Sequence, residues 1–447
     1  MNLSSLVKVF SVKRCHKVYV KKLAANDNSK NQVYFGGSFD ILNILPSSKT
    51  TTDTDEEDKR ESFKSKLDFY WLDEEGNSYH APKSQLISYP DYPEIRFSGF
   101  LSGCENAPSK LMNSRLKDRI LFLGVSDDRK LFGFVISPES EIYNEFLAIK
   151  NMETHGVFFV LTILNSKIET DSKDKLLQEL KRIHQLGWIN SKRLTPNFDL
   201  IPCESSNCGG FTLEAELNIP SNSKAEPDFL GWELKNFHVD NFDKINSKVI
   251  TLMDHSPSHG FFNENGVEAF VRKYGYPDKK GREARINFGG THKYGIIHHL
   301  TSLKLVIVGF DEENLKILSP DGYVALLDKD ENIAASWSFT SLIEHWTAKH
   351  PKACYVPSKI NKSHLLETKK RQYAYGNKII LGSYTDVTML LGQIFLGKTY
   401  YDPGIKLELA IEGERKKSAK VRSLFRIKSG NISSLYKINE IVDLNFM

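Results

Sequence analysis

The sequence predicts two domains, an all-β domain at the N-terminus and an α/β domain at the C-terminus. The chain has 447 residues, which is more than a single hydrophobic core usually serves. Short runs of β-branched and aromatic residues fill the first third of the chain, and helical patterns mixed with strand-like runs begin near residue 170. The apolar fraction of 40% and the charged fraction of 26% are ordinary for a soluble globular protein.

Six short runs predict the strands of the N-terminal domain, because turn residues separate them. They are KVYVKKL, NQVYFGG, LDFYWL, EIRFSGFL, RILFLGV and LFGFVI. The segment 47–62 is polar, acidic and rich in Ser and Thr, so we expect a mobile loop there. Many short strands with few helical patterns predict a small barrel or sandwich.

A helix predicted over DSKDKLLQELKRIHQLGW opens the C-terminal domain. Its Asp and Ser residues form a cap signal, and apolar side chains follow at helical spacing, namely Leu176, Leu177, Leu180, Ile183 and Leu186. The boundary is therefore expected within 145–170, which gives domains of residues 1–160 and 165–447. Farther along, FLGWELKNF, KLVIVGF and KLELAIEG are strand-like, and TDVTMLLGQIFLG is helical.

Charge and cysteine content restrict the environment of the chain. The net charge of +4 permits a polyanionic partner without demanding one. The five cysteines include no C-x-x-C pair, and Cys203 and Cys208, the closest two, lack a matching metal-binding cluster. This pattern predicts neither a disulfide scaffold nor structural zinc, and it fits a reducing cytoplasm. The N-terminus lacks the apolar core of a signal peptide, and no apolar run is long enough to span a membrane.

The segment 209–237, GGFTLEAELNIPSNSKAEPDFLGWELKNF, brings carboxylates and an amine together. Pro227 favours an extended chain or a turn before Asp228, and FLGWELKNF reads as a strand. Side chains alternate faces along a strand, so Glu233 and Lys235 share one face. Asp228 precedes Glu233 by five residues, close enough for both carboxylates to meet one ion.

Hydrolysis of a phosphodiester needs this combination. Carboxylate oxygens bind Mg²⁺, which polarises the phosphate and lowers the pKa of a bound water, and a neighbouring lysine can orient that water. Glu214, fourteen residues before Asp228, is expected on a short helix as a third carboxylate, whereas Glu216 would point to another side. The alternative is a set of solvated charges, because D-x₄-E-x-K also arises by chance.

The block PDFLGWELK, with Leu-Glu fourteen residues before its Asp, resembles the MvaI/BcnI restriction endonucleases and the related repair nuclease MutH. The resemblance implies a PD-(D/E)xK nuclease core of MutH type over roughly residues 170–440. It implies catalytic roles for Glu214, Asp228, Glu233 and Lys235, and metal binding by the first three. It also implies that Mg²⁺ is the cofactor, with Mn²⁺ as a substitute, that double-stranded DNA is the substrate, and that the enzyme is a monomer paired with a cognate DNA methyltransferase.

The predicted DNA-binding residues of this domain lie in two basic segments, 272–292 and 415–422, and at Arg426 on the strand that follows the second segment. Basic and aromatic side chains at these positions can contact phosphates, which supply most of the affinity for DNA, or base edges; they are Arg272, Tyr274, Arg285, His292, Arg422 and Arg426. The alternative is a solvated basic loop. The resemblance implies a short GC-rich target such as CCWGG, but the sequence ERKKSAKVRSL replaces the His/Asp/Gly-containing loop of the family, which puts the target in doubt.

The segment VYVKKLAANDNSKNQVYF resembles the opening of the EcoRII-like B3 DNA-binding domain. The resemblance implies a B3-like pseudobarrel in which two arms grip the major groove. Side chains of suitable chemistry for reading bases or phosphates are Asn26, Asn28, Lys30, Asn31, Gln32 and Arg96. A polar hairpin loop without a DNA role is the alternative. A B3 domain joined to an MvaI-like nuclease further implies a Type IIE enzyme with an N-terminal effector domain.

Three functions stay open at this level. The extra N-terminal domain and the FLGWELK spacing favour a Type II restriction endonuclease over a strand-nicking repair enzyme of the shorter MutH type. The third possibility is a DNA-binding protein without activity. The intact Glu/Asp/Glu/Lys set argues against it.

Overall fold

The computed structural model describes residues 1–25, 32–37, 41–54, 61–89, 94–126, 128–150, 152–163, 166–205, 207–221, 227–319, 321–408 and 420–446. It divides into two compact units, the first comprising residues 1–169 and 317–320 and the second residues 170–316 and 321–447. Among the residues described, none of the helices combines the length and the apolar character needed to cross a bilayer.

The first unit consists mostly of strands, as the sequence predicts. Its seven-stranded sheet runs in the order β11 (Glu153–His155), β12 (Phe158–Thr162), β1 (Cys15–Leu23), β9 (Arg119–Ser126), β10 (Leu131–Ile136), β5 (Phe69–Leu72) and β6 (Ser78–His80). Its five-stranded sheet runs in the order β2 (Val33–Tyr34), β8 (Glu94–Ser98), β7 (Gln85–Tyr89), β4 (Glu61–Leu67) and β3 (Ser47–Thr54). The helices are α1 (Leu3–Val12), α2 (Ile41–Ile44), α3 (Ser109–Met112) and α4 (Glu141–Leu147).

Aromatic side chains join the two sheets of the first unit. Phe69 of β5 packs edge-on against Phe97 of β8, with ring centroids 5.1 Å apart, and Phe35 contacts Phe158 of β12. Arg119 is fully buried, yet its guanidinium donates to four backbone carbonyl oxygens, those of Leu116, Leu111, Met112 and Ala24. This satisfies the charge that burial would otherwise make costly.

Two features of this unit differ from the sequence prediction. The segment expected to be a mobile loop, 47–62, contains the paired strands β3 and the start of β4, with Thr54 opposite Glu61. Cross-strand pairing thus overrides its polar composition, because backbone hydrogen bonds form whatever the side chains are. The N-terminal helix α1 was not predicted; Asn2 caps it by accepting from the backbone N–H of Ser5.

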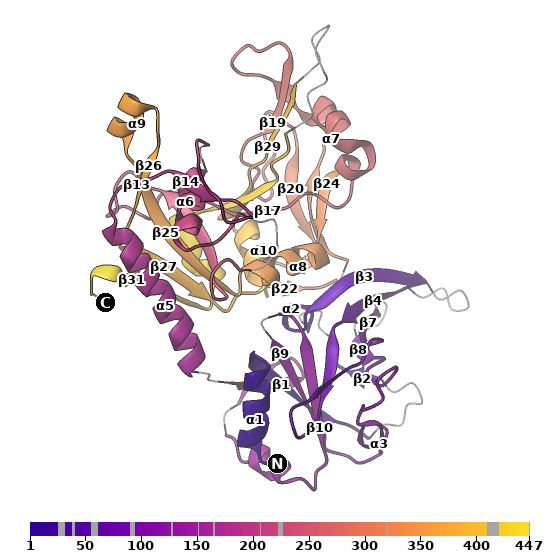
Figure 1. The fold of residues 1–447 in the computed structure, drawn as a ribbon. Coiled ribbons are helices and arrows are strands. Elements are labelled where there is room, and N and C mark those ends of the chain that lie inside the picture. Colours follow the sequence, from indigo (N-terminus) through magenta and orange to yellow (C-terminus); the bar gives the residue numbers. More distant parts are fainter. Residues whose placement is uncertain are drawn as a thin grey trace. The chain divides into compact units, whose positions relative to one another are not determined.

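The second unit is built on a six-stranded sheet. The order is β13 (Ile189–Asn190), β26 (Gln372–Tyr375), β25 (Lys352–Ile360), β27 (Lys378–Ser383) and β31 (Ile438–Asp443), with β16 (Glu233–His238) pairing parallel to β25. Helices α5 (Ser166–Gln185) and α6 (Cys208–Glu216) pack their apolar side chains on this sheet. Figure 1 shows α5 lying along the sheet. The helix predicted for Glu214 is therefore confirmed. The helix predicted from the leucine spacing is also present, but it begins earlier, at Ser166, and ends at Gln185, so that Leu186 lies outside it and is exposed.

The remaining elements of the second unit form smaller sheets and helices. The strands are β14 (Lys192–Leu194) with β15 (Leu200–Pro202), β17 (Val249–Asp254) with β30 (Leu424–Lys428) and β28 (Thr399–Tyr401), β18 (Tyr276–Pro277) with β19 (Arg285–Gly289) and β29 (Gly404–Glu408), β20 (Lys304–Val308) with β23 (Tyr323–Leu327) and β24 (Ile333–Ser338), and β21 (Phe310–Asp311) with β22 (Lys316–Ile317). The helices are α7 (Phe261–Tyr274), α8 (Phe339–Lys349), α9 (Lys362–Thr368) and α10 (Val387–Phe395), with short 3₁₀ helices at Ser429–Leu435 and Leu444–Phe446.

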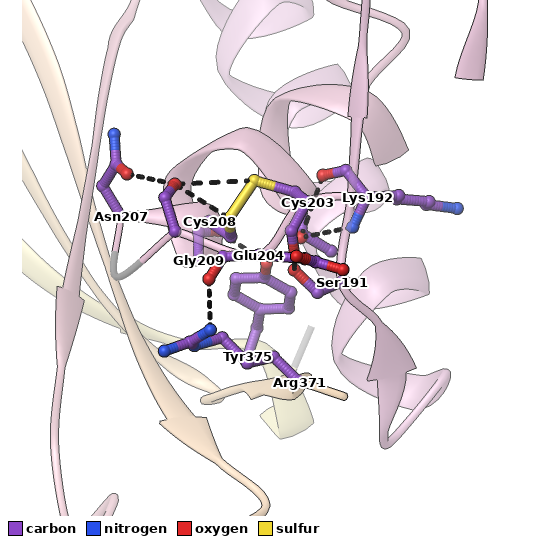
Figure 2. The surroundings of a disulfide bond; sticks show 11 residues. Ser191, Lys192, Cys203, Glu204, Asn207, Cys208, Gly209, Arg371 and Tyr375 are labelled. Carbon is purple, nitrogen blue, oxygen red and sulfur yellow. Dashed lines mark hydrogen bonds between the residues drawn. A yellow bond between two sulfur atoms is a disulfide. The ribbon is translucent and has the colours of Figure 1, made fainter. Parts of the chain in front are cut away.

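A disulfide bond joins Cys203 and Cys208, which corrects the expectation of reduced cysteines. The loop between β15 and α6 brings the two Cα atoms to 5.8 Å, within the range that a disulfide spans. Figure 2 shows the bond above Tyr375, at the start of the helix that carries Glu214. The spacing of the cysteines in the sequence does not reveal this loop closure. The cysteines consequently no longer support a reducing compartment.

Candidate active site

Helix α6 is held against strand β16 at its first turn. A Cβ atom at Gly209 would lie 2.6 Å from the Asn236 Oδ1 atom, so a larger residue here would force the Asn236 side chain to move. The Tyr375 hydroxyl donates to the Gly209 carbonyl oxygen at 2.7 Å. Together with the disulfide at Cys208, these contacts fix the helix that presents Glu214.

A tight turn returns Asp228 to the side of β16. Phe229 and Trp232 exchange two backbone hydrogen bonds, and the residues between them, Leu230 and Gly231, have φ of 49° and 83°. Two positive φ values are typical of a type I′ turn. The turn brings the Asp228 Oδ2 atom to 2.8 Å from the backbone N–H of Leu234, which donates to it. The strand therefore begins at Glu233 rather than at Phe229, where the sequence suggested.

Glu233 and Lys235 lie side by side on one face of β16. The Lys235 ammonium donates to the Glu233 Oε1 atom at 2.6 Å. The Glu233 side chain is only 3% exposed, and its Oε2 atom has no hydrogen-bond partner in the described part of the chain. A buried carboxylate oxygen without a partner is costly, so this atom is available to a ligand that the protein itself does not supply.

The carboxylates repel one another in a poorly solvated site. Burial, and then the charge of Asp228, raises the pKa of Glu214 to about 7. Burial, and then the charge of Glu233, raises the pKa of Asp228 to about 6. Lys235 opposes both shifts. Glu214, Asp228, Glu233 and Lys235, from here on the carboxylate–lysine cluster, thus form one electrostatic unit assembled from a helix, a turn and a strand.

The donor chemistry of this cluster fits a hard divalent cation. Its carboxylate oxygens are the ligands that Mg²⁺ prefers, and a cation would relieve both the mutual repulsion and the unpartnered Glu233 Oε2 atom. Within the described residues, however, no three His, Cys, Asp or Glu side chains are already gathered in the geometry of a metal site. Mg²⁺ usually binds through one or two carboxylates and several waters, so an open cluster is compatible with it.

Glu216 belongs to a different surface of α6. Its carboxylate pairs with the Lys192 ammonium at 2.5 Å and with the Arg182 guanidinium at 3.5 Å. These two cations neutralise it away from the carboxylate–lysine cluster.

Helix α8 brings two further groups to the cluster that the sequence reasoning did not identify. The Lys349 ammonium lies 4.0 Å from the Glu233 Oε1 atom, and its charge acts on Glu214 and Asp228 as well. The ring of His345, one helical turn earlier, contacts the ring of His255 in a tilted arrangement, with ring centroids 4.7 Å apart. Burial, followed by the charges of His255, Lys349 and Lys235, lowers the pKa of His345 to about 4, which keeps the imidazole neutral at pH 7. Their i, i+4 spacing was the available signal.

Two of the residues predicted to bind DNA in the second unit are part of its interior. His292 is fully buried, and its ring nitrogens contact the Gly290 carbonyl oxygen and the Thr301 hydroxyl. Tyr274 is also buried, and its hydroxyl donates to Asp328 at 3.1 Å. Both side chains are thus engaged within the protein. The sequence could not separate them from the exposed basic residues nearby.

The four predicted arginines retain some exposure. Arg285 of β19 pairs with Glu408 of the adjacent strand β29, and the carbonyl oxygen of exposed Arg422 accepts from Gly404 at the start of β29. Arg426 of β30 donates to Asp402 at 2.6 Å. Arg272 of α7 pairs with Glu268 of the same helix. Figure 1 shows β19 and β29 side by side next to α7.

In the first unit, the structure brings Arg96 and Gln32 together. The Arg96 guanidinium donates to the Gln32 Oε1 atom at 3.0 Å and pairs with Glu94 at 2.7 Å. Tyr34, on β2, lies opposite Arg96 in the sheet. The other predicted positions, Asn26, Asn28, Lys30 and Asn31, lie outside the described residues.

Comparisons with known proteins place this geometry in context. The model of the MvaI/BcnI restriction endonuclease family matches residues 177–436, more than half of the chain, including the whole carboxylate–lysine cluster. A solved structure described as a restriction endonuclease MvaI–cognate DNA substrate complex is 20% identical over 61% of this chain and 97% of its own, with a TM-score of 0.44. MvaI in the absence of DNA is 18% identical over 61% and 98%, with a TM-score of 0.32. Curated protein sequences give no match.

Proposed function

The chain belongs to the MvaI/BcnI restriction endonuclease family, and from this premise we propose that it cleaves double-stranded DNA at a specific sequence in a reaction that requires Mg²⁺. The observation that carries the proposal is the carboxylate–lysine cluster, in which the Glu233 Oε2 atom is buried without a partner beside two carboxylates of raised pKa. Mn²⁺ is expected to substitute for Mg²⁺, because it accepts the same oxygen ligands.

Each member of the cluster has a role that its geometry supports. Asp228, Glu233 and Glu214 would hold the cation, directly or through waters. When bound, the cation would polarise the scissile phosphate and lower the pKa of a water. Lys235, now donating to Glu233, would turn to orient that water or to stabilise charge on the phosphate. The water would lose a proton to solvent as it attacks phosphorus, the bond to the sugar oxygen would break, and that leaving oxygen would take up a proton from solvent.

We propose that Arg285, Arg422 and Arg426 contact the DNA around the cut. Arg285 and Arg426 each hold a carboxylate and keep a buried Nε–H without a partner in the described residues. Arg422 is exposed. Arginine forks of this kind suit phosphates and guanine edges. Arg272 would contact a DNA phosphate farther from the cut. The recognition sequence that we propose resembles CCWGG.

For the N-terminal domain expected over residues 1–160, which lies within the first unit, we propose a B3-like DNA-binding role. Its support is the strand-rich fold and the Arg96–Gln32 pair, a partly exposed hydrogen-bonding group of the kind that reads adenine and guanine edges. If both units bind the same site, the first would act as an effector, as in a Type IIE enzyme, either by relieving inhibition or by tethering the nuclease near a second site, which raises the local concentration of DNA. The proposal also includes a monomeric enzyme and a cognate methyltransferase that protects the host sites.

Cleavage of plasmid DNA tests these proposals. The full chain should convert a plasmid to linear DNA with Mg²⁺ and should fail to do so with excess EDTA. Stable nicks would support a MutH-like activity instead, and binding without cutting would support a DNA-binding protein. For the effector role, a plasmid with two sites should be cut faster than one with a single site, and Arg96→Ala should narrow that difference. Equal rates on both plasmids would remove the effector role and leave the nuclease in place.

A further inference from the structure

Two ammonium groups, those of Lys235 and Lys349, lie near the same carboxylate oxygen of Glu233. Its Oε1 atom accepts from Lys235 at 2.6 Å, and Lys349 lies 4.0 Å from the same atom. The Oε2 atom has no partner within the described residues. If Lys235 turns toward the phosphate or the attacking water, it weakens the bond that now stabilises a nearly fully buried carboxylate. Leaving such a carboxylate without a counter-charge is strongly destabilising.

We infer that Lys349 is a positioning residue that takes over Glu233 Oε1 when Lys235 moves to the substrate, so that Glu233 keeps its orientation toward the cation. The inference rests on the proposed nuclease function and adds a residue to it. Lys349 is 25% exposed and pairs with no other carboxylate in the part of the chain that the structure describes.

The backbone around Lys349 is anchored firmly enough for this role. The next residue, His350, is fully buried and contacts the Leu252 carbonyl oxygen and the Tyr436 hydroxyl. Trp346 stacks on His350 at 4.0 Å. Strand β25 begins three residues after Lys349, and its Ala353 lies opposite Glu233 in the parallel pairing with β16. The end of α8 and the catalytic strand are therefore tied to each other through one sheet.

The position of Lys349 on its helix also favours a cation. It is the last residue of α8, where the carbonyl ends of the helix carry partial negative charge. The long side chain needs only a small change in its terminal torsions to close a gap from 4.0 Å to hydrogen-bond distance. An arginine has the reach and the charge to do the same, whereas methionine has a similar stem without the charge.

The test compares Lys349→Met and Lys349→Arg with Lys173→Met as the matched control. Lys173 forms a Lys–Glu pair with Glu440 at 2.5 Å, on α5 and away from the cluster. Three quantities are measured: the single-turnover cleavage rate at saturating Mg²⁺, the affinity for DNA in Ca²⁺, and the binding of Mn²⁺ to the protein without DNA by calorimetry.

We expect Lys349→Met to lower the cleavage rate by about 10- to 100-fold, as losses of groups that orient metal ligands do. Mn²⁺ should bind this variant as tightly as the wild type or more tightly, because a repelling charge is gone, and DNA affinity should stay within about threefold. Lys349→Arg should recover most of the rate, and Lys173→Met should match the wild type.

Two results would overturn the inference while the nuclease assignment stands. One is a wild-type rate in Lys349→Met. The other is a loss of Mn²⁺ binding and thermal stability in Lys349→Met that Lys349→Arg does not recover, which would make Lys349 a structural residue. A wild-type protein that does not cut DNA at all would instead remove the proposed function, and this inference with it.

Discussion

Replacing Glu214 with glutamine should stabilise the metal-free protein at pH 8. Burial and the neighbouring Asp228 raise the pKa of this carboxyl to about 7 from an ordinary value of 4.5, so the folded state disfavours its charged form. At 1.36 kcal/mol per pKa unit, the difference between these two pKa values corresponds to a loss of about 3 kcal/mol in the free energy of unfolding when Glu214 is charged. Because Glu214 is only partly buried, screening by water reduces this effect. We expect Glu214→Gln to raise the free energy of unfolding by about 2 kcal/mol, which corresponds to a rise in Tm of roughly 4 to 8 °C.

The sign of the effect depends on pH. A carboxyl whose pKa is raised by folding contributes stability below its unfolded pKa, and that contribution is lost as the pH rises through the folded pKa. The advantage of Glu214→Gln should therefore be present at pH 8 and vanish near pH 4. Added Mg²⁺ should raise the Tm of the wild type more than that of the variant, because the cation binds the charged cluster.

Thermal unfolding in EDTA at pH 4 and pH 8 measures this difference, with Glu216→Gln as the control. Glu216 lies on the same helix but pairs with Lys192 and Arg182, so its replacement should lower the Tm at pH 8. A Glu214→Gln variant that is no more stable than the wild type at pH 8, or equally stabilised at both pH values, would refute the electrostatic account of the site.

Three other predictions concern the turn, the disulfide and the DNA surface. Leu230→Asn should stabilise the protein by about 1 kcal/mol in denaturant unfolding, because Leu230 has a φ of 49° that asparagine adopts more readily; a loss of stability would contradict the turn assignment. Adding a reductant, or replacing Cys203 with serine, should lower the free energy of unfolding by about 2 kcal/mol. An unchanged free energy of unfolding would show that the Cys203–Cys208 bond is not formed. In Ca²⁺, Arg422→Ala should weaken DNA binding and reduce the salt dependence of the affinity by about one counterion. Tyr274→Phe, at a buried position, should bind DNA like the wild type. Weaker binding by Tyr274→Phe together with wild-type binding by Arg422→Ala would overturn the proposed DNA-binding surface.

The sequence predicted the elements of this protein best where one pattern alone decides the structure. The leucine spacing predicted α5. The alternation of side chains along a strand predicted that Glu233 and Lys235 lie side by side, and in the structure the Lys235 ammonium is 2.6 Å from the Glu233 Oε1 atom. Residues 47–54 and 61–62 of the polar segment were wrongly expected to form a loop, because their pairing as β3 and β4 depends on a partner strand and not on their composition, whereas residues 55–60 lie outside the described residues.

Features that depend on tertiary structure escaped the sequence reasoning. Lys349 follows Glu233 by more than a hundred residues, and only the parallel pairing of β16 with β25 brings them together. His292 and Tyr274 looked like members of a basic surface but are buried, since a local window cannot tell which side of a segment faces the core. Cys203 and Cys208 are joined because the loop between β15 and α6 folds back on itself, which their spacing does not reveal.

The most direct test of the central claim is to map the DNA ends that the full chain produces with Mg²⁺ on a genome-sized substrate, for the wild type and for Asp228→Ala. The wild type should leave ends within one recurring short sequence, and Asp228→Ala should leave none while still binding that sequence in Ca²⁺. Ends scattered without a common sequence would contradict site-specific cleavage, and recurring ends from Asp228→Ala at the wild-type rate would contradict the assignment of the carboxylate–lysine cluster as the active site.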